Sequence, residues 1–176
     1  MEKFKIVEQF KLFNQTEAYL INMPFDLKRN ESEYHERLGR LSSYHDQFEN
    51  DPGWMVYNHL PPCQINFVQS NDSYKGNEAV SFMKSQGGFP LTRDNLFMLP
   101  FFFKEKLLKF RAMYAFMEEE YLPLHNDGKK IIPFLKLKEG CNSDLDFDWY
   151  FFEDTFPSHH YFVFFSFVLP ELRKKR

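Results

Sequence analysis

Cysteine and long apolar runs are both scarce in this 176-residue chain. Cys63 and Cys141 allow at most one disulfide, and their separation is not that of a paired-cysteine zinc site. The first fifteen residues, MEKFKIVEQFKLFNQ, lack the apolar stretch of a signal peptide. The most apolar run, 161–169, is interrupted by Ser166 and is too short to span a bilayer as a helix. We therefore expect a soluble, cytoplasmic protein that contacts no membrane.

Alanine is also rare, whereas phenylalanine is abundant at 23 residues. A core filled mainly by large rings favours sheets and helices packed on sheets over tight bundles, which need small residues at close contacts. The excess rings should partly reach the surface, where aromatic side chains are typical of binding faces.

Basic residues are outnumbered, and the formal net charge is −3. The last four residues, RKKR, carry four positive charges, so the rest of the chain has 18 basic against 25 acidic residues. We interpret 172–176 as a frayed basic tail. An acidic body argues against binding to nucleic acid and is compatible with a basic protein partner.

The first half of the chain predicts helices and two strands. The apolar residues of 4–21 fit a strand or a helix, and we favour a helix. A helix over 34–48 is predicted by apolar residues at helical spacing after a capping signal at Asn30. Strands are expected over 54–60 and 63–69, and a short helix over 77–88, capped by Asn77.

The second half predicts one long central helix and then three strands. An unbroken apolar stripe at helical spacing runs from Pro100 to Tyr121. Strand-like runs follow over 131–138, 144–152 and 161–169, and their short connections suggest an antiparallel meander whose last strand is interior. We predict one α+β domain over 1–176, in which an antiparallel sheet packs with the long helix and two or three further helices.

The stretch SDLDFDWYFFED, residues 143–154, is the best functional candidate. In a strand, alternate residues share a face, so three aspartates would stand in a row while Leu145, Phe147 and Trp149 face the core. A solvated strand face explains this pattern, and so does a ridge that binds a basic protein through carboxylates and aromatic anchors. The candidate partner-binding residues are Asp144, Asp146, Asp148, Trp149, Tyr150, Glu153 and Asp154. A calcium loop fails, because Trp149 and Thr155 stand where glycine and glutamate are required.

Other chemistries have weaker support in the sequence. His35 and His45 lack the spacing of helical metal ligands, and the adjacent His159 and His160 would face opposite ways in a strand. Cys141 has no motif of a catalytic nucleophile, and the glycines match no nucleotide-binding motif. We therefore predict no metal, no cofactor and no catalytic residue.

Two hypotheses remain after this reading. The first is an inhibitor of immunity type that neutralises a basic protein, such as a toxin or nuclease, through the acidic and aromatic surface. The second is a small enzyme or ligand-binding domain, whose pocket would hold at least two of His125, His159, His160, Cys63 and Cys141 near an acid. The sequence favours binding over catalysis and leaves monomer or homodimer undecided.

Overall fold

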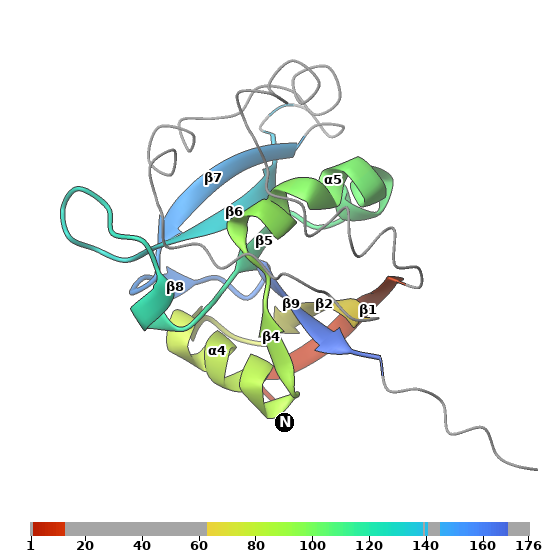
Figure 1. The fold of residues 1–176 in the computed structure, drawn as a ribbon, viewed down its shortest axis with the longest axis horizontal. Helices are drawn as coiled ribbons and strands as arrows, with labels where there is room; N and C mark the ends of the chain where they lie inside the picture. Colours follow the sequence, from red (N-terminus) through yellow and green to blue (C-terminus); the bar gives the residue numbers. More distant parts are fainter. Residues whose placement is uncertain (1, 13–62, 139, 141–144, 169–176) are drawn as a thin grey trace, which may run out of the picture.

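The fold is taken from a computed structural model, which describes residues 2–12, 63–138, 140 and 145–168 (Figure 1). The predicted helix over 34–48, the predicted strand over 54–60 and the basic tail lie outside these residues. The elements, in chain order, are β1 Phe4–Leu12, β2 Cys63–Ser70, β3 Tyr74–Lys75, α4 Gly76–Ser85, β4 Gly88–Pro90, α5 Arg93–Leu107, β5 Ala112–Ala115, the 3-10 helix η1 Glu119–Tyr121, β6 Ile131–Leu137, β7 Leu145–Phe151, β8 Thr155–Phe156 and β9 Tyr161–Phe167.

A mixed seven-stranded sheet dominates the described part of the chain. Its main order is β1-β2-β9-β5-β6-β7, with β4 also paired to β9, and β3 and β8 form a separate two-stranded ribbon. The predicted α+β class, with a long central helix and two or three others, is therefore wrong, because the described residues contain only α4 and α5 as α-helices. The predicted meander is correct only for the antiparallel β6–β7 pair. The last strand, β9, is interior as predicted, but it lies between β2 and β5 and runs parallel to β5.

The predicted helix from Pro100 to Tyr121 is instead the end of one helix followed by a strand. α5 begins earlier, at Arg93, and ends at Leu107, so Pro100 lies inside the helix rather than at its start. Beyond a short turn, 112–115 form β5, and every side chain from Ala112 to Met117 is buried. Residues buried on all sides give no periodic signal that separates a helix from a central strand, and the helical spacing was therefore misleading.

The N-terminal segment, for which we favoured a helix, is strand β1. Ile6 pairs with Val68 and Glu8 pairs with Phe67, so Val7 is an extra residue in a β-bulge. The bulge transfers the even-numbered apolar residues from one face of the sheet to the other. Phe4 therefore packs into the core on one face and Phe10 into the core on the other, a change that simple alternation does not predict.

Each face of the sheet carries its own hydrophobic core and its own helix (Figure 1). Leu96, Leu99 and Leu107 of α5 belong to the core on the first face, which we call the α5 face. Ala79, Val80 and Met83 of α4 belong to the core on the second, the α4 face. The predicted strand over 63–69 and helix over 77–88 are confirmed as β2 and α4, although the residue preceding α4 is Lys75 rather than Asn77. Neither described helix has the length and apolar character needed to cross a membrane.

Candidate functional site

The candidate surface is built on β7, the last of the described strands at one end of the sheet. As predicted, Leu145 and Phe147 are buried in the α5-face core, while Asp146 and Asp148 project from the opposite face and are partly exposed. Tyr150 shares the face of the two aspartates and packs against the α4-face core. Alternation along the strand therefore places two of the predicted carboxylates and one predicted aromatic ring side by side.

The Asp148 carboxylate has two structural partners. Its Oδ2 accepts a hydrogen bond from Lys136 Nζ at 2.7 Å, and its Oδ1 accepts one from the Trp149 backbone N–H at 2.9 Å. Lys136 also lies directly opposite Asp146 in the β6–β7 register. The acidic row is thus partly neutralised by a lysine of the neighbouring strand, which a reading of 143–154 alone could not detect.

Tyr150 connects the aspartates to aromatic residues that the sequence did not single out. Its ring packs on Tyr114 at a centroid distance of 5.9 Å and on Phe156 at 5.4 Å. Tyr114 is 1% exposed, and its hydroxyl lies 2.9 Å from His160 Nδ1. Burial, together with Tyr150 and Asp148, raises the pKa of Tyr114, so its phenol stays protonated at neutral pH.

Trp149 is separated from the aspartates because it lies on the α5 face. Its ring packs against His125 in a tilted arrangement at a centroid distance of 4.8 Å and contacts Phe151 at 5.0 Å. Asp127 approaches His125 Nδ1 at 3.0 Å, and Lys129 lies over the Phe151 ring. The predicted ridge of acids with both Trp149 and Tyr150 therefore divides between the two faces of the sheet.

The remaining predicted residues flank β7. Glu153 and Asp154 lie in the turn between β7 and β8, and Glu153 is exposed. The Glu153 carbonyl accepts a hydrogen bond from Lys75 Nζ, and the Phe151 carbonyl accepts one from the Asp154 N–H. Asp144 lies outside the described residues. The part of the predicted set that the structure brings together is Asp146, Asp148 and Tyr150, with Glu153 and Asp154 at the end of the strand.

The prediction that His159 and His160 face opposite ways in a strand is wrong. His159 and His160 precede β9 rather than lying within a strand, and their rings meet at a centroid distance of 4.5 Å instead of facing opposite ways. His125 lies near an acid, Asp127, but on the other face of the sheet, and Cys63 is buried in the α5-face core. Cys141 is not among the described residues. Within the described ranges no group of three or more His, Cys, Asp or Glu side chains is placed to hold a metal ion.

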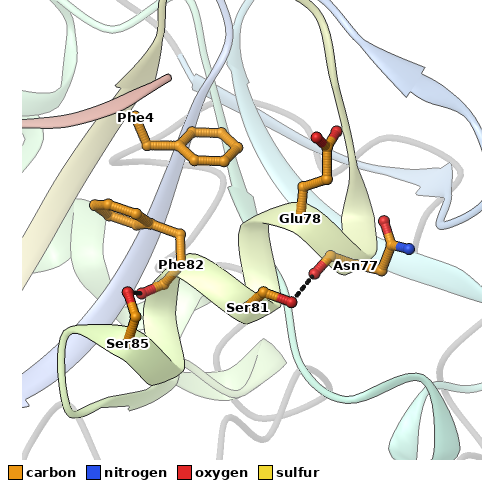
Figure 2. A pocket seen from close by; sticks show the side chains of 6 residues that line it. All are labelled: Phe4, Asn77, Glu78, Ser81, Phe82 and Ser85. Carbon is orange, nitrogen blue, oxygen red and sulfur yellow. Dashed lines mark hydrogen bonds between the residues drawn. The ribbon is translucent and has the colours of Figure 1, made fainter. Parts of the chain in front are cut away.

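An open groove of about 380 Å³ runs along α4, and Figure 2 shows the side chains that line it, including the rings of Phe4 and Phe82. Its polar groups are largely engaged. The Glu78 carboxylate accepts hydrogen bonds from Lys3 Nζ at 2.6 Å and from the Lys75 N–H at 2.8 Å. The Ser81 and Ser85 hydroxyls donate to carbonyls of their own helix. The groove therefore presents mainly two aromatic rings and offers few free polar groups for recognition.

Comparison with known proteins gives no relative, since no protein-family model, curated protein or solved structure matches this chain.

Proposed function

We propose that this chain is a protein-binding inhibitor of immunity type, which neutralises a basic protein partner such as a toxin or nuclease. The surface that we assign to the partner consists of Asp146, Asp148, Tyr150, Glu153 and Asp154, and we call it the β7 surface. The observation that carries this proposal is the placement of two partly exposed carboxylates and a tyrosine on one face of the outermost described strand, with two further acids in the next turn.

The chemistry of these residues suits a charged partner. Tyrosine is enriched at the energetic centres of interfaces because it combines a large apolar ring with a polar end. Carboxylates around it steer a basic partner and favour it over acidic competitors. Lys136 limits this attraction, since it is bonded to Asp148. We therefore assign most of the steering to Glu153 and Asp154, which lie in the turn after β7, and to Asp148 a role in holding the strand.

A pull-down from the native source, at low and at high salt, tests the proposal. The baits are the wild-type protein and a variant carrying Asp146→Asn, Glu153→Gln and Asp154→Asn, with Asp148 left intact to protect the strand. A matched control removes three exposed acids that lie elsewhere in the chain, with Glu2→Gln, Glu105→Gln and Glu119→Gln.

We expect a basic protein that is recovered at low salt by the wild type and the control, recovered poorly at high salt, and lost by the β7 variant. Equal recovery by all three baits would exclude the β7 surface as the interface. A fourth bait carries Tyr150→Ala alone. If a partner resists high salt and is lost only with this bait, the β7 surface remains the interface, but its affinity comes from the Tyr150 ring.

A further inference from the structure

Strand β1 forms one end of the sheet, and its outer edge pairs with no other strand among the residues that the structure describes (Figure 1). The Lys3 carbonyl accepts a hydrogen bond from the N–H of Asn71, which follows β2, so the backbone of Lys3 faces β2. Alternation then turns the backbone N–H and C=O groups of Phe4 and Ile6 toward the outer edge. A strand of nine residues with such an edge is a template for pairing with a further strand.

The bulge at Val7 decides which strand matches this edge. Residues 4–9 of β1, six in number, lie opposite residues 66–70 of β2, which are only five. The backbone groups that point outward therefore belong to even-numbered residues before Val7 and to the odd-numbered Gln9 after it. A regular strand would be one residue short over this stretch. A second copy of β1 carries the same bulge and has the same number of residues.

An antiparallel register that places Phe4 opposite Gln9 of a second copy fits this edge. The two-fold axis then lies between Ile6 and Val7, and residues 4–9 of the two copies match one to one. Phe4 and Gln9 both direct their backbone groups outward, so they can exchange hydrogen bonds across the interface. Their side chains also share a face of the sheet. Phe4 packs in the α4-face core, and Gln9 lies on that face because the adjacent Phe10 lies on the other.

The same register is complementary in charge. Lys5 lies opposite Glu8 of the second copy, and alternation places both side chains on the α5 face. Lys5 is exposed and is bonded to no described carboxylate, whereas Glu8 is bonded to Lys109 through Oε2 and keeps Oε1 for a second cation. Two-fold symmetry repeats this ion pair on the other side of the axis. A register shifted by two residues in either direction would place Lys5 opposite Ile6 or Phe10 and would lose both pairs.

The centre of such an interface is apolar. Val7 is 39% exposed and Ile6 is half-buried, and in this register each lies opposite the other at the two-fold axis. Phe4 also lines the open groove along α4, so the groove adjoins the paired edge (Figure 2). An apolar centre between two ion pairs has the organisation of a protein–protein interface, with a polar rim around an apolar core.

We propose that two copies of this chain associate through β1, which pairs antiparallel with itself about a two-fold axis. The Lys5–Glu8 pairs select the register, and the two sheets join into one. Pairing of two strand edges buries less surface than a stable interface, so we expect a weak dimer with a dissociation constant on the order of 10 µM. Because β1 and β7 lie at opposite ends of the sheet, the dimer leaves the β7 surface accessible and does not depend on the function proposed for it.

Sedimentation in the analytical ultracentrifuge tests the proposal with the full-length protein at about 1 to 200 µM. The wild type should pass from monomer to dimer over this range, and added sodium chloride should weaken the dimer. Lys5→Glu places acid opposite acid and Glu8→Lys places base opposite base, so each variant alone should lose affinity about tenfold or more. A mixture of the two should form a heterodimer, because one ion pair keeps its polarity and the other is reversed. A fluorescent label on the Lys5→Glu chain identifies this heterodimer.

Two further variants serve as control and as an independent probe. Glu105→Lys reverses an exposed acid on α5, so it should dimerise like the wild type and should not recruit the labelled Lys5→Glu chain. Val7→Lys adds charge at the axis and should weaken the dimer about tenfold, while its exposed position lets the chain fold. Circular dichroism checks the fold of each variant, and if Glu8→Lys does not fold, Lys5→Glu and Val7→Lys decide the question. A monomeric wild type at about 200 µM, wild-type association in Lys5→Glu or Val7→Lys, or no heterodimer from two folded charge variants would overturn the proposal.

Discussion

Asp148 should stabilise the fold, and its two bonds can be measured separately. The bond from Lys136 joins two side chains that are 35% and 26% exposed, so solvent screens it, and we expect it to contribute about 0.5–1 kcal/mol. The bond from the Trp149 N–H goes to a charged acceptor, and removal of such a bond costs about 1.5–3 kcal/mol. We place it at the lower end of this range, because water can replace a partly exposed acceptor. Asp148→Ala should then lower the free energy of unfolding by about 2 kcal/mol.

Three variants, measured by urea unfolding, separate these contributions. Lys136→Met keeps the apolar stem and removes only the ion pair, so it should cost about 0.5–1 kcal/mol. Asp148→Asn keeps an oxygen for the Trp149 N–H and loses the charge, so it should cost about 1 kcal/mol. Glu153→Ala, at an exposed carboxylate, should stay within about 0.5 kcal/mol of the wild type. If Lys136→Met were as damaging as Asp148→Ala, or if Asp148→Asn were no better than Asp148→Ala, the bond to the Trp149 amide would have no structural role.

Three further predictions concern the core, the buried thiol and the response to acid. Gly76→Ala, at the start of α4, should destabilise the protein by about 1–3 kcal/mol in thermal unfolding, because the new Cβ would lie 2.5 Å from the Phe152 ring; an increase in stability would contradict this contact. In a Cys141→Ser background, Cys63 should react with a thiol reagent only as fast as the protein unfolds, since it is fully buried and burial raises the pKa of its thiol to about 11. The free energy of unfolding should fall as pH drops from 6.5 to 4, because the lowered pKa of His160 lets the unfolded chain bind its proton first; His160→Asn should fall less over this window, and an identical pH profile would disprove the coupling.

The sequence predicted local structure well where one face of an element is polar. The alternation of Asp146 and Asp148 with Leu145 and Phe147 was read correctly, because the two faces of β7 have different surroundings. The strand over 63–69 was also predicted, since its β-branched and aromatic residues are bounded by turn residues.

Prediction failed where burial on both faces removes the alternation of polar and apolar residues, and where a bulge in the strand pairing interrupts that alternation. The residues around β5 are buried on both faces, so apolar spacing could not distinguish a strand from a central helix. Val7 adds a residue to β1, and the apolar side chains before and after it enter different cores. Neither the bulge nor the neighbours of β5 are local properties of the sequence.

The candidate site was predicted only along a single strand. The partners that determine what those residues do come from elsewhere in the chain. Lys136 reaches Asp148 from β6, whereas Tyr114 and Tyr150 meet across the α4 face from β5 and β7. The sequence of one strand predicts which face of the sheet each side chain points to, but it does not predict which strand will be its neighbour. The charge of the row was therefore overestimated, and the position of Tyr114 against His160 could not be foreseen.

Asp148 holds the strand, whereas the other acids of the β7 surface supply charge, and this difference decides how a loss of binding in β7 variants is interpreted. A variant in which Asp148 is changed removes a negative charge and also releases the Trp149 amide, so lost binding could follow from a distorted strand. Glu153 lies in the turn after β7 with an exposed side chain, so its change to Gln tests charge at the surface more directly. If Glu153→Gln weakens capture of a basic partner while the unfolding free energy stays near the wild-type value, the effect is electrostatic. If capture falls only with Asp148→Ala, and in proportion to its lost stability, the aspartate supports the strand and the β7 surface owes its affinity to other residues.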